Sequence, residues 1–293
     1  MCRGFKAQGA WFKVQGSGKN LMFRSRVITA VVLLVLFLLA LFALPDNGWA
    51  ALVTVLVLQG ASEWSRLSGF SGRTANGFLG LTLMMMLGLI WLDAYHTLEQ
   101  QALPHVLVYV MSAVLWLAIV PAWLIGGWKV RQPLLMALVG WAVLIPTGLA
   151  MQDLRDGHPM WLLGMMGLVW VADIAAYFIG RKFGRNKLAP SISPGKTWEG
   201  VAGAMLGVTA YVLVAWSVSG FSHVILPVVL VASWCWVGLA VLGDLFESAI
   251  KRQAGVKDSG ALLPGHGGLL DRSDALTSTL PLAALAILLQ HLS

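Results

Sequence analysis

Four polar side chains near the end of one apolar stretch are spaced to act together. Asp244, Glu247, Ser248 and Lys251 stand at positions i, i+3, i+4 and i+7, which places them on one face of a helix. A solvated helix end with a Glu247–Lys251 ion pair would show the same spacing. Asp244 lies deepest in the apolar stretch, however, and ionisable groups at such depth in a membrane are usually functional.

The segment that follows combines groups for binding metal and phosphate. Lys257 and Asp258 precede a glycine-rich turn at 264–268, whose backbone amides can approach an anion closely. Asp271 and Asp274 then stand one helical turn apart. Carboxylate oxygens are ligands suited to Mg²⁺, while lysines and backbone amides suit phosphate. The combination predicts metal-assisted chemistry on a nucleotide.

A second polar segment, residues 173–200, supplies cations for such a site. Asp173 lies about two turns before the end of another apolar stretch, where an unpaired carboxylate costs on the order of 2.5–3.5 kcal/mol and requires a cation. The loop after it carries five basic residues, Arg181, Lys182, Arg185, Lys187 and Lys196. For Arg181, Lys182 and Arg185, a role in setting the membrane topology alone explains the positive charge equally well. Lys196 is different because it lies in a shaped turn, Ser-Pro-Gly-Lys-Thr.

Long apolar helices must position these residues, because the composition excludes a water-soluble chain. Of 293 residues, 58% are hydrophobic and 11% are charged, and the mean hydropathy is +0.78, whereas soluble chains carry roughly 25% charged residues. About 20 apolar residues span the hydrocarbon core of a bilayer. Nine such stretches occur, at 27–44, 49–66, 77–95, 104–127, 133–151, 161–180, 198–219, 223–243 and 275–292. We therefore expect an all-α integral membrane protein with about nine transmembrane helices.

The basic residues predict how these helices are oriented. With the N-terminus in the cytoplasm, 19 of the 20 lysines and arginines face that side, and Arg155 alone lies outside. This asymmetry follows the positive-inside rule, so the net charge of +7 reflects topology and indicates no nucleic-acid partner. Most carboxylates also fall on the inner side. The site is therefore expected at the cytoplasmic ends of the helices.

The same pattern divides the chain into three regions. These are a basic cytoplasmic tail at 1–26, N-terminal transmembrane helices at 27–151 and a C-terminal catalytic transmembrane region at 152–293. The first apolar stretch lacks a small-residue cleavage site, so we expect a retained helix and not a removable signal peptide. Two cysteines cannot build a disulfide framework or a cysteine-based zinc site. The six histidines never pair at metal-ligand spacing, so the sequence predicts no zinc site.

The order of these motifs resembles the signature of phosphatidate cytidylyltransferases, also called CDP-diacylglycerol synthases. The signature runs Ser248-x-x-Lys251-Arg252, Lys257-Asp258-Ser259-Gly260, Pro264-Gly265-His266-Gly267-Gly268 and Asp271-Arg272-x-Asp274. Earlier parts of the chain are similar to the same family at Asp173-x-x-Ala176-Tyr177, Gly180-Arg181, Ser193-Pro194-Gly195-Lys196-Thr197-x-Glu199-Gly200, Glu63-Trp64 and Gly243-Asp244. The resemblance is dense from about residue 160 to 293 and sparse before that.

The resemblance implies a multi-pass nucleotidyltransferase of phospholipid biosynthesis in the cell inner (cytoplasmic) membrane, acting as a homodimer. It would transfer the cytidylyl group of CTP to phosphatidate, a membrane lipid, giving CDP-diacylglycerol and pyrophosphate with Mg²⁺ as cofactor. The implied catalytic residues are Asp244, Ser248, Lys251 and Asp271. The implied metal ligands are Asp173, Asp244, Asp258, Asp271 and Asp274. The implied substrate-binding residues are Tyr177, Ser193, Lys196, Arg252, Lys257, His266 and Arg272.

Two alternatives stay open on the sequence. A cytidylyltransferase or CTP-dependent kinase that acts on another membrane lipid would share the nucleotide and the metal but not the acceptor. A transporter that used Asp173 and Asp244 as ion-coupling carboxylates would show inverted repeats or helices broken at matching positions in two halves, and no such repeat is visible. A kinase releases CDP whereas a cytidylyltransferase releases pyrophosphate, so the leaving group separates these reaction classes.

Overall fold

The protein is a bundle of long helices with one small β-hairpin, as described by a computed structural model. The structure describes residues 29–95, 98–219, 226–262 and 267–292. The elements are α2 (Asp46–Leu67), α3 (Gly72–Tyr95), α4 (Leu98–Val114), the π-helical turn η1 (Leu115–Ile119), α5 (Val120–Gly126), α6 (Pro133–Gly157), α7 (Pro159–Phe183), β1 (Lys187–Ala189), β2 (Ser193–Thr197), α8 (Trp198–Ser219), α9 (Leu226–Gln253) and α10 (Leu270–Leu292). A further helix covers Thr29–Ala43.

Within the described residues, seven helices are long and apolar enough to cross a membrane. They are α3, the continuous unit α4–η1–α5, α6, α7, α8, α9 and α10. The other two predicted stretches are also helical, but the helix over Thr29–Ala43 is short, and α2 carries Asp46, Glu63 and Arg66. The multi-pass class is thus supported, while the count of nine and the orientation stay predictions.

Exposed apolar side chains on these helices are consistent with a lipid environment. Met84, Ile125 and Val218 are among the most exposed large hydrophobic residues, and such surfaces are rare on soluble monomers. Backbone polar groups cannot remain unpaired in hydrocarbon, so continuous helices are the form that such segments must take. Lipid contact therefore explains both the exposed surface and the helical backbone.

Prolines and glycines mark where several helices begin and end. Pro133 and Pro159 occupy the first turns of α6 and α7, where a missing N–H costs nothing. The side chain of His158 accepts a hydrogen bond from the Met160 amide and caps α7. Gly127 ends α5 with a positive φ of 59°, a conformation that glycine adopts without steric cost.

The β-hairpin departs from the all-α prediction. β1 and β2 pair antiparallel, with Lys187 opposite Thr197 and Ala189 opposite Ser193. Pro190 and Pro194 interrupt any helix here because proline removes the N–H that a helix interior needs. The hairpin connects α7 to α8 and carries the predicted substrate-binding residue Lys196.

Close helix packing depends on glycines at crossing points. A Cβ atom at Gly203 or Gly207 of α8 would come within 2.6 Å of α7 side-chain atoms, so α7 and α8 pack directly together. One hydrophobic core joins residues of the Thr29–Ala43 helix and of every later helix except α8, and a smaller one joins α7, α8 and α9. The predicted domain boundary at 151–152 falls inside α6. The basic tail at 1–26 lies outside the described residues.

Candidate functional site

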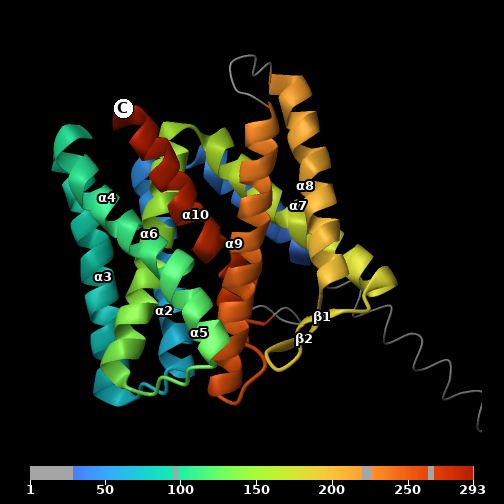
Figure 1. The fold of residues 1–293 in the computed structure, drawn as a ribbon. Coiled ribbons are helices and arrows are strands. Elements are labelled where there is room, and N and C mark those ends of the chain that lie inside the picture. The colour runs from blue at the N-terminus through green and yellow to red at the C-terminus, as the bar shows by residue number, and fades with distance from the viewer. Residues whose placement is uncertain (1–28, 96–97, 220–225, 263–266, 293) are drawn as a thin grey trace, which may run out of the picture.

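The two polar segments of the chain meet at one end of the bundle. There α7 and α9 end, α8 and α10 begin, and the β-hairpin lies beside them (Figure 1). α9 continues as helix to Gln253, about ten residues beyond the predicted end of that span. The predicted polar face of Asp244, Glu247, Ser248 and Lys251 is therefore confirmed as helical.

The first group of charges, here called the carboxylate cluster, consists of Asp173, Lys196, Asp244 and Asp274. Lys196 Nζ lies 2.5 Å from Asp244 Oδ2, which brings β2 of the hairpin against α9. Asp173 and Asp274 both lie close enough to Asp244 for the charges to interact. Four elements that are separate in sequence, α7, β2, α9 and α10, thus place one charged side chain each in the cluster.

A glycine explains how α9 and α10 come close enough to form this cluster. A Cβ atom at Gly243 would lie 2.5 Å from the Asp274 carbonyl oxygen and 2.6 Å from Ser278 Oγ. Ser278 Oγ also donates a hydrogen bond of 2.8 Å to the Leu239 carbonyl of α9. The residue next to Gly243 is Asp244, so this contact fixes the separation of Asp244 from Asp274.

The second group, here called the Lys251 cluster, consists of Glu247, Lys251, Ser259 and Asp271. Lys251 Nζ lies 2.6 Å from Asp271 Oδ1 and 3.1 Å from Glu247 Oε1. Asp271 Oδ2 accepts hydrogen bonds from the Ser259 amide, Ser259 Oγ and the Gly268 amide. Both oxygen atoms of Asp271 therefore bind protein donors, and the turn at Ser259 is held against the start of α10.

A residue that the sequence reasoning left without a role completes this arrangement. Glu63 of α2 is fully buried, with 0% exposure. Its Oε2 accepts from Ser259 Oγ at 2.8 Å and from the Leu270 amide at 2.9 Å, and its Oε1 accepts from the Leu269 amide at 2.8 Å. A carboxylate here also meets the positive N-terminal end of the α10 dipole. Glu63 thus anchors the loop before α10 to α2.

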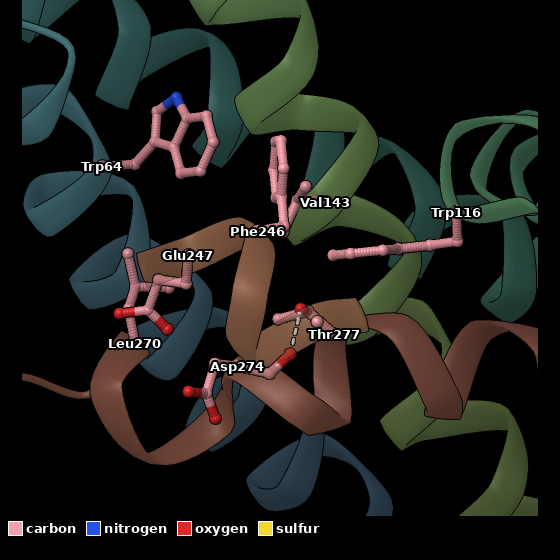
Figure 2. A pocket seen from close by; sticks show the side chains of 9 residues that line it. Trp64, Trp116, Val143, Phe246, Glu247, Leu270, Asp274 and Thr277 are labelled. Carbon is pink, nitrogen blue, oxygen red and sulfur yellow. Dashed lines mark hydrogen bonds between the residues drawn. The ribbon is translucent and has the colours of Figure 1, made fainter. Parts of the chain in front are cut away.

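A small cavity of about 10 Å³ lies between the clusters and the aromatic core, enough for about one water molecule. Figure 2 shows the rings of Trp64, Phe246 and Trp116 around one side of it, with the carboxyl groups of Glu247 and Asp274 on the other. Among the described residues, no donor of hydrogen-bonding geometry reaches the Glu247 oxygens. Glu247 is balanced instead by the ion pair with Lys251.

The remaining predicted residues surround the clusters at greater exposure. Ser248 Oγ lies 3.4 Å from Asp244 Oδ1, and Arg252 Nε donates to the Ile192 carbonyl at 3.3 Å, which joins α9 to the hairpin turn. Tyr177 accepts a hydrogen bond from Arg181. Ser193 lies in β2, whereas Lys257, Asp258 and Arg272 are exposed. His266 lies outside the described residues.

Three of the predicted metal ligands fit a divalent cation by their chemistry. Asp173, Asp244 and Asp274 present hard carboxylate oxygens, the kind that Mg²⁺ prefers, and Lys196 offers one positive charge against the three of them. Asp271 differs because its oxygens already accept from Lys251, Ser259 and Gly268. The carboxylate cluster is therefore the better candidate for holding a metal ion.

The chain is similar to known proteins over most of its length. The model of the cytidylyltransferase family matches residues 24–290. A phosphatidate cytidylyltransferase of Haemophilus influenzae is 36% identical, over 89% of this chain and 96% of its own. One of Pseudomonas aeruginosa is 38% identical, over 90% of this chain and 96% of its own. One of Brucella melitensis is 33% identical, over 87% of this chain and 89% of its own.

Proposed function

The chain belongs to the cytidylyltransferase family, and from that premise we propose that it transfers the cytidylyl group of CTP to phosphatidate, giving CDP-diacylglycerol and pyrophosphate. The observation that carries the proposal is the carboxylate cluster, which includes Lys196, beside Lys251 at the ends of apolar helices. A nucleotide and a lipid phosphate can meet at such a place, where polar side chains border the membrane.

The reaction joins two anions, so the residues must neutralise charge and align the groups. A phosphate oxygen of phosphatidate attacks the α-phosphorus of CTP and forms a new P–O bond. The bond from that phosphorus to the oxygen bridging the β-phosphate breaks, and pyrophosphate leaves with its electrons. Positioning and electrostatic stabilisation supply most of the rate enhancement in such transfers.

We assign Mg²⁺ to Asp173, Asp244 and Asp274, with Asp258 and Asp271 as further predicted ligands. When bound, the ion would polarise the phosphates and stabilise the departing pyrophosphate. Lys196 pairs with Asp244 and is poised to exchange that contact for a phosphate oxygen. Asp271 holds Lys251 at 2.6 Å, so we assign it the additional task of orienting this lysine.

The other assigned residues contact the substrates around this centre. Lys251, Arg252, Lys257 and Arg272 form a cationic group on α9, the following loop and α10, which suits the polyphosphate of CTP. Ser248 and Ser193 offer hydroxyl groups on α9 and β2. Tyr177 and His266 are assigned as further polar contacts to the substrates. The acyl chains of phosphatidate lie among the lipid-exposed helices.

We further propose that the protein is a multi-pass protein of the cell inner membrane, with the site facing the cytoplasm, and that it acts as a homodimer. Basic residues gather at the end of the bundle that carries the site, whereas Arg155 lies at the other end. This asymmetry supports the orientation through the positive-inside rule. CTP is available on that side of the membrane.

The leaving group tests the proposal. Purified protein in mixed micelles is supplied with Mg²⁺, phosphatidate and CTP labelled at either the α- or the γ-phosphate. We expect the α-label in the lipid product and the γ-label in released pyrophosphate, both dependent on phosphatidate. A γ-label in the lipid, with release of CDP, would contradict the proposal and identify a kinase.

A matched pair of variants tests the carboxylate cluster in the same assay. Asp244→Asn replaces a charged ligand with a neutral amide, and we expect it to abolish turnover at every Mg²⁺ concentration. Asp156→Asn makes the same change at the opposite end of the bundle, where the side chain is 57% exposed, and we expect nearly unchanged turnover. Full activity of both variants would remove Asp244 from the proposed site.

A further inference from the structure

A second group of charges lies at the end of the bundle opposite the proposed site. His105 of α4 stands between Asp93, near the end of α3, and Asp153, near the end of α6. His105 Nε2 lies 3.0 Å from Asp93 Oδ1, and His105 Nδ1 lies 3.0 Å from Asp153 Oδ2. The histidine is buried, with 6% exposure, so these contacts are shielded from bulk solvent.

Asp153 is held in place from two directions. Tyr109, one turn after His105 on α4, donates a hydrogen bond of 2.6 Å to Asp153 Oδ2, and the same oxygen faces His105 Nδ1. Tyr109 is fully buried. A carboxylate bound to one ring nitrogen fixes the orientation of a histidine and leaves the other nitrogen directed at a ligand, as is typical of histidines that bind metals.

The other ring nitrogen has the environment of a metal ligand. Among the described residues, no partner of hydrogen-bonding geometry reaches His105 Nε2, although Asp93 Oδ1 lies 3.0 Å from it. Two ligands each about 2.1 Å from one cation lie roughly 3.0–3.4 Å apart at octahedral or tetrahedral angles. One donor atom from each of Asp93, His105 and Asp153 can be chosen so that all lie within 4.8 Å of one another.

The charge balance also favours a cation. Asp93 and Asp153 bring two negative charges to the ends of apolar helices, and buried charges require compensation. In the described part of the chain, Arg155 is the one lysine or arginine at this end, and its guanidinium is engaged elsewhere, with Asp46 and the Leu41 carbonyl. A proton on His105 supplies one positive charge beside these two carboxylates, whereas a divalent cation with a neutral imidazole supplies two.

We infer that His105 Nε2 and Asp93 bind a divalent transition-metal ion of the Zn²⁺ class, and that Asp153 orients the imidazole through Nδ1. A set of imidazole and carboxylate ligands suits Zn²⁺ better than Mg²⁺. The site joins α3, α4 and α6 far from the carboxylate cluster, so its role is to stabilise this end of the bundle. The side chains of Asp93 and Asp153 are 29% and 25% exposed, which gives an ion access from solvent.

Metal titration of tag-free, chelator-treated protein tests this site. We expect one equivalent of Zn²⁺ bound through at least one imidazole nitrogen, as detected by calorimetry and X-ray absorption spectroscopy. His105→Gln should weaken this binding at least tenfold. His158→Gln removes an exposed histidine from the same end of the bundle and should leave the binding unchanged. Zn²⁺ should also raise the melting temperature of the wild type more than that of His105→Gln.

A second variant keeps the test decisive if His105→Gln does not fold. Asp93→Asn changes a more exposed ligand and should weaken Zn²⁺ binding at least tenfold, while pyrophosphate release stays near the wild-type rate. Wild-type protein that binds no imidazole-ligated metal would overturn the inference. The histidine would then be a protonated bridge between two carboxylates. Equal binding by His105→Gln and the wild type would overturn it as well.

Discussion

The ion pair between Lys196 and Asp244 is short but only partly buried, with side-chain exposures of 23% and 33%. Ion pairs open to solvent contribute about 0–1 kcal/mol to stability. Lys196 is therefore placed where its charge matters little for folding. The same charge matters more for binding a phosphate that enters a partly dry site. Removing the lysine charge should therefore reduce activity strongly and change stability little.

Lys196→Met is expected to reduce the rate of pyrophosphate release by about 100-fold or more, the scale observed for loss of one preorganised electrostatic contact. The melting temperature should change by no more than a few degrees. Lys187→Met, on the other strand of the hairpin and exposed, is the matched control and should retain activity. Equal activity of the two variants would exclude Lys196 from substrate binding.

Glu63→Gln tests the buried anchor of the loop before α10. Each Glu63 oxygen accepts from one backbone amide, Leu269 or Leu270. Whichever way a glutamine turns, its NH₂ group faces one of these donors, at a cost of about 1–3 kcal/mol. We expect a melting temperature lower by roughly 3–10 °C, together with reduced activity.

The control for that change is Glu199→Gln at the start of α8. Glu199 accepts from the Asn186 amide and side chain, but it is more exposed than Glu63. Water can replace the lost acceptor there, so we expect a smaller decrease in melting temperature. If both variants lower the melting temperature equally, the buried Glu63 contributes no more to stability than the more exposed Glu199.

Sequence spacing predicts well which residues lie together when they belong to the same helix. Asp244, Glu247 and Lys251 are one helical face, and a period of 3.6 residues identifies it. Glu63 and Ser259 meet across 196 positions, and no periodicity relates them. A single carboxylate at the inner end of a predicted span was the signal available for Glu63. The cluster of Asp93, His105 and Asp153 shows the same limit, since its members lie on three helices.

At the scale of elements, the positions of the helices are predictable because about 20 apolar residues are needed to span a membrane. All nine predicted stretches contain helix in the described residues, although seven are long and apolar enough to cross. The β-hairpin was not predicted, because its charges and prolines resemble an ordinary loop. Its pairing depends on backbone contacts between residues 187–189 and 193–197, which leave no hydrophobic pattern.

The contact of α9 with α10 can be tested at Gly243. An alanine there would push its Cβ against the Asp274 carbonyl and Ser278 Oγ, at 2.5 and 2.6 Å, so the helices must separate. We expect Gly243→Ala to lower the melting temperature and to reduce activity at least tenfold, because Asp244 moves away from Asp274. Gly238→Ala, on the same helix with nothing within 4 Å of its Cβ, should alter neither quantity.

At the scale of the whole molecule, the basic residues and the site gather at one end of the bundle, and the Asp93, His105 and Asp153 group lies at the other. This difference between the two ends of the bundle matches the charge asymmetry of the sequence. It means that the two ends face different solutions once the helices span a membrane. The orientation can be tested by chemical labelling from each side.

Single cysteines at Lys257 and Met160 should react from opposite sides of the membrane. Both positions are exposed and lie at opposite ends of the bundle. Cys2 and Cys235 are first replaced by serine or alanine. In intact spheroplasts, a membrane-impermeant maleimide should label the Met160→Cys protein, whereas the Lys257→Cys protein should be labelled only after lysis. Labelling of both from one side would contradict the predicted orientation.

The bonds of Glu63 to the start of α10 also bear on how the protein is made. Glu63 lies on an early helix, and its partners Ser259, Leu269 and Leu270 leave the ribosome about two hundred residues later. Throughout that interval the donors from Ser259, Leu269 and Leu270 do not yet exist, and only Gln59, one turn earlier on α2, is present of the donors that the described structure gives Glu63. The turn at Ser259 and the orientation of Asp271 are completed when the last helix arrives. A partly synthesised chain therefore has no assembled site, and nucleotide chemistry begins only after translation through α10.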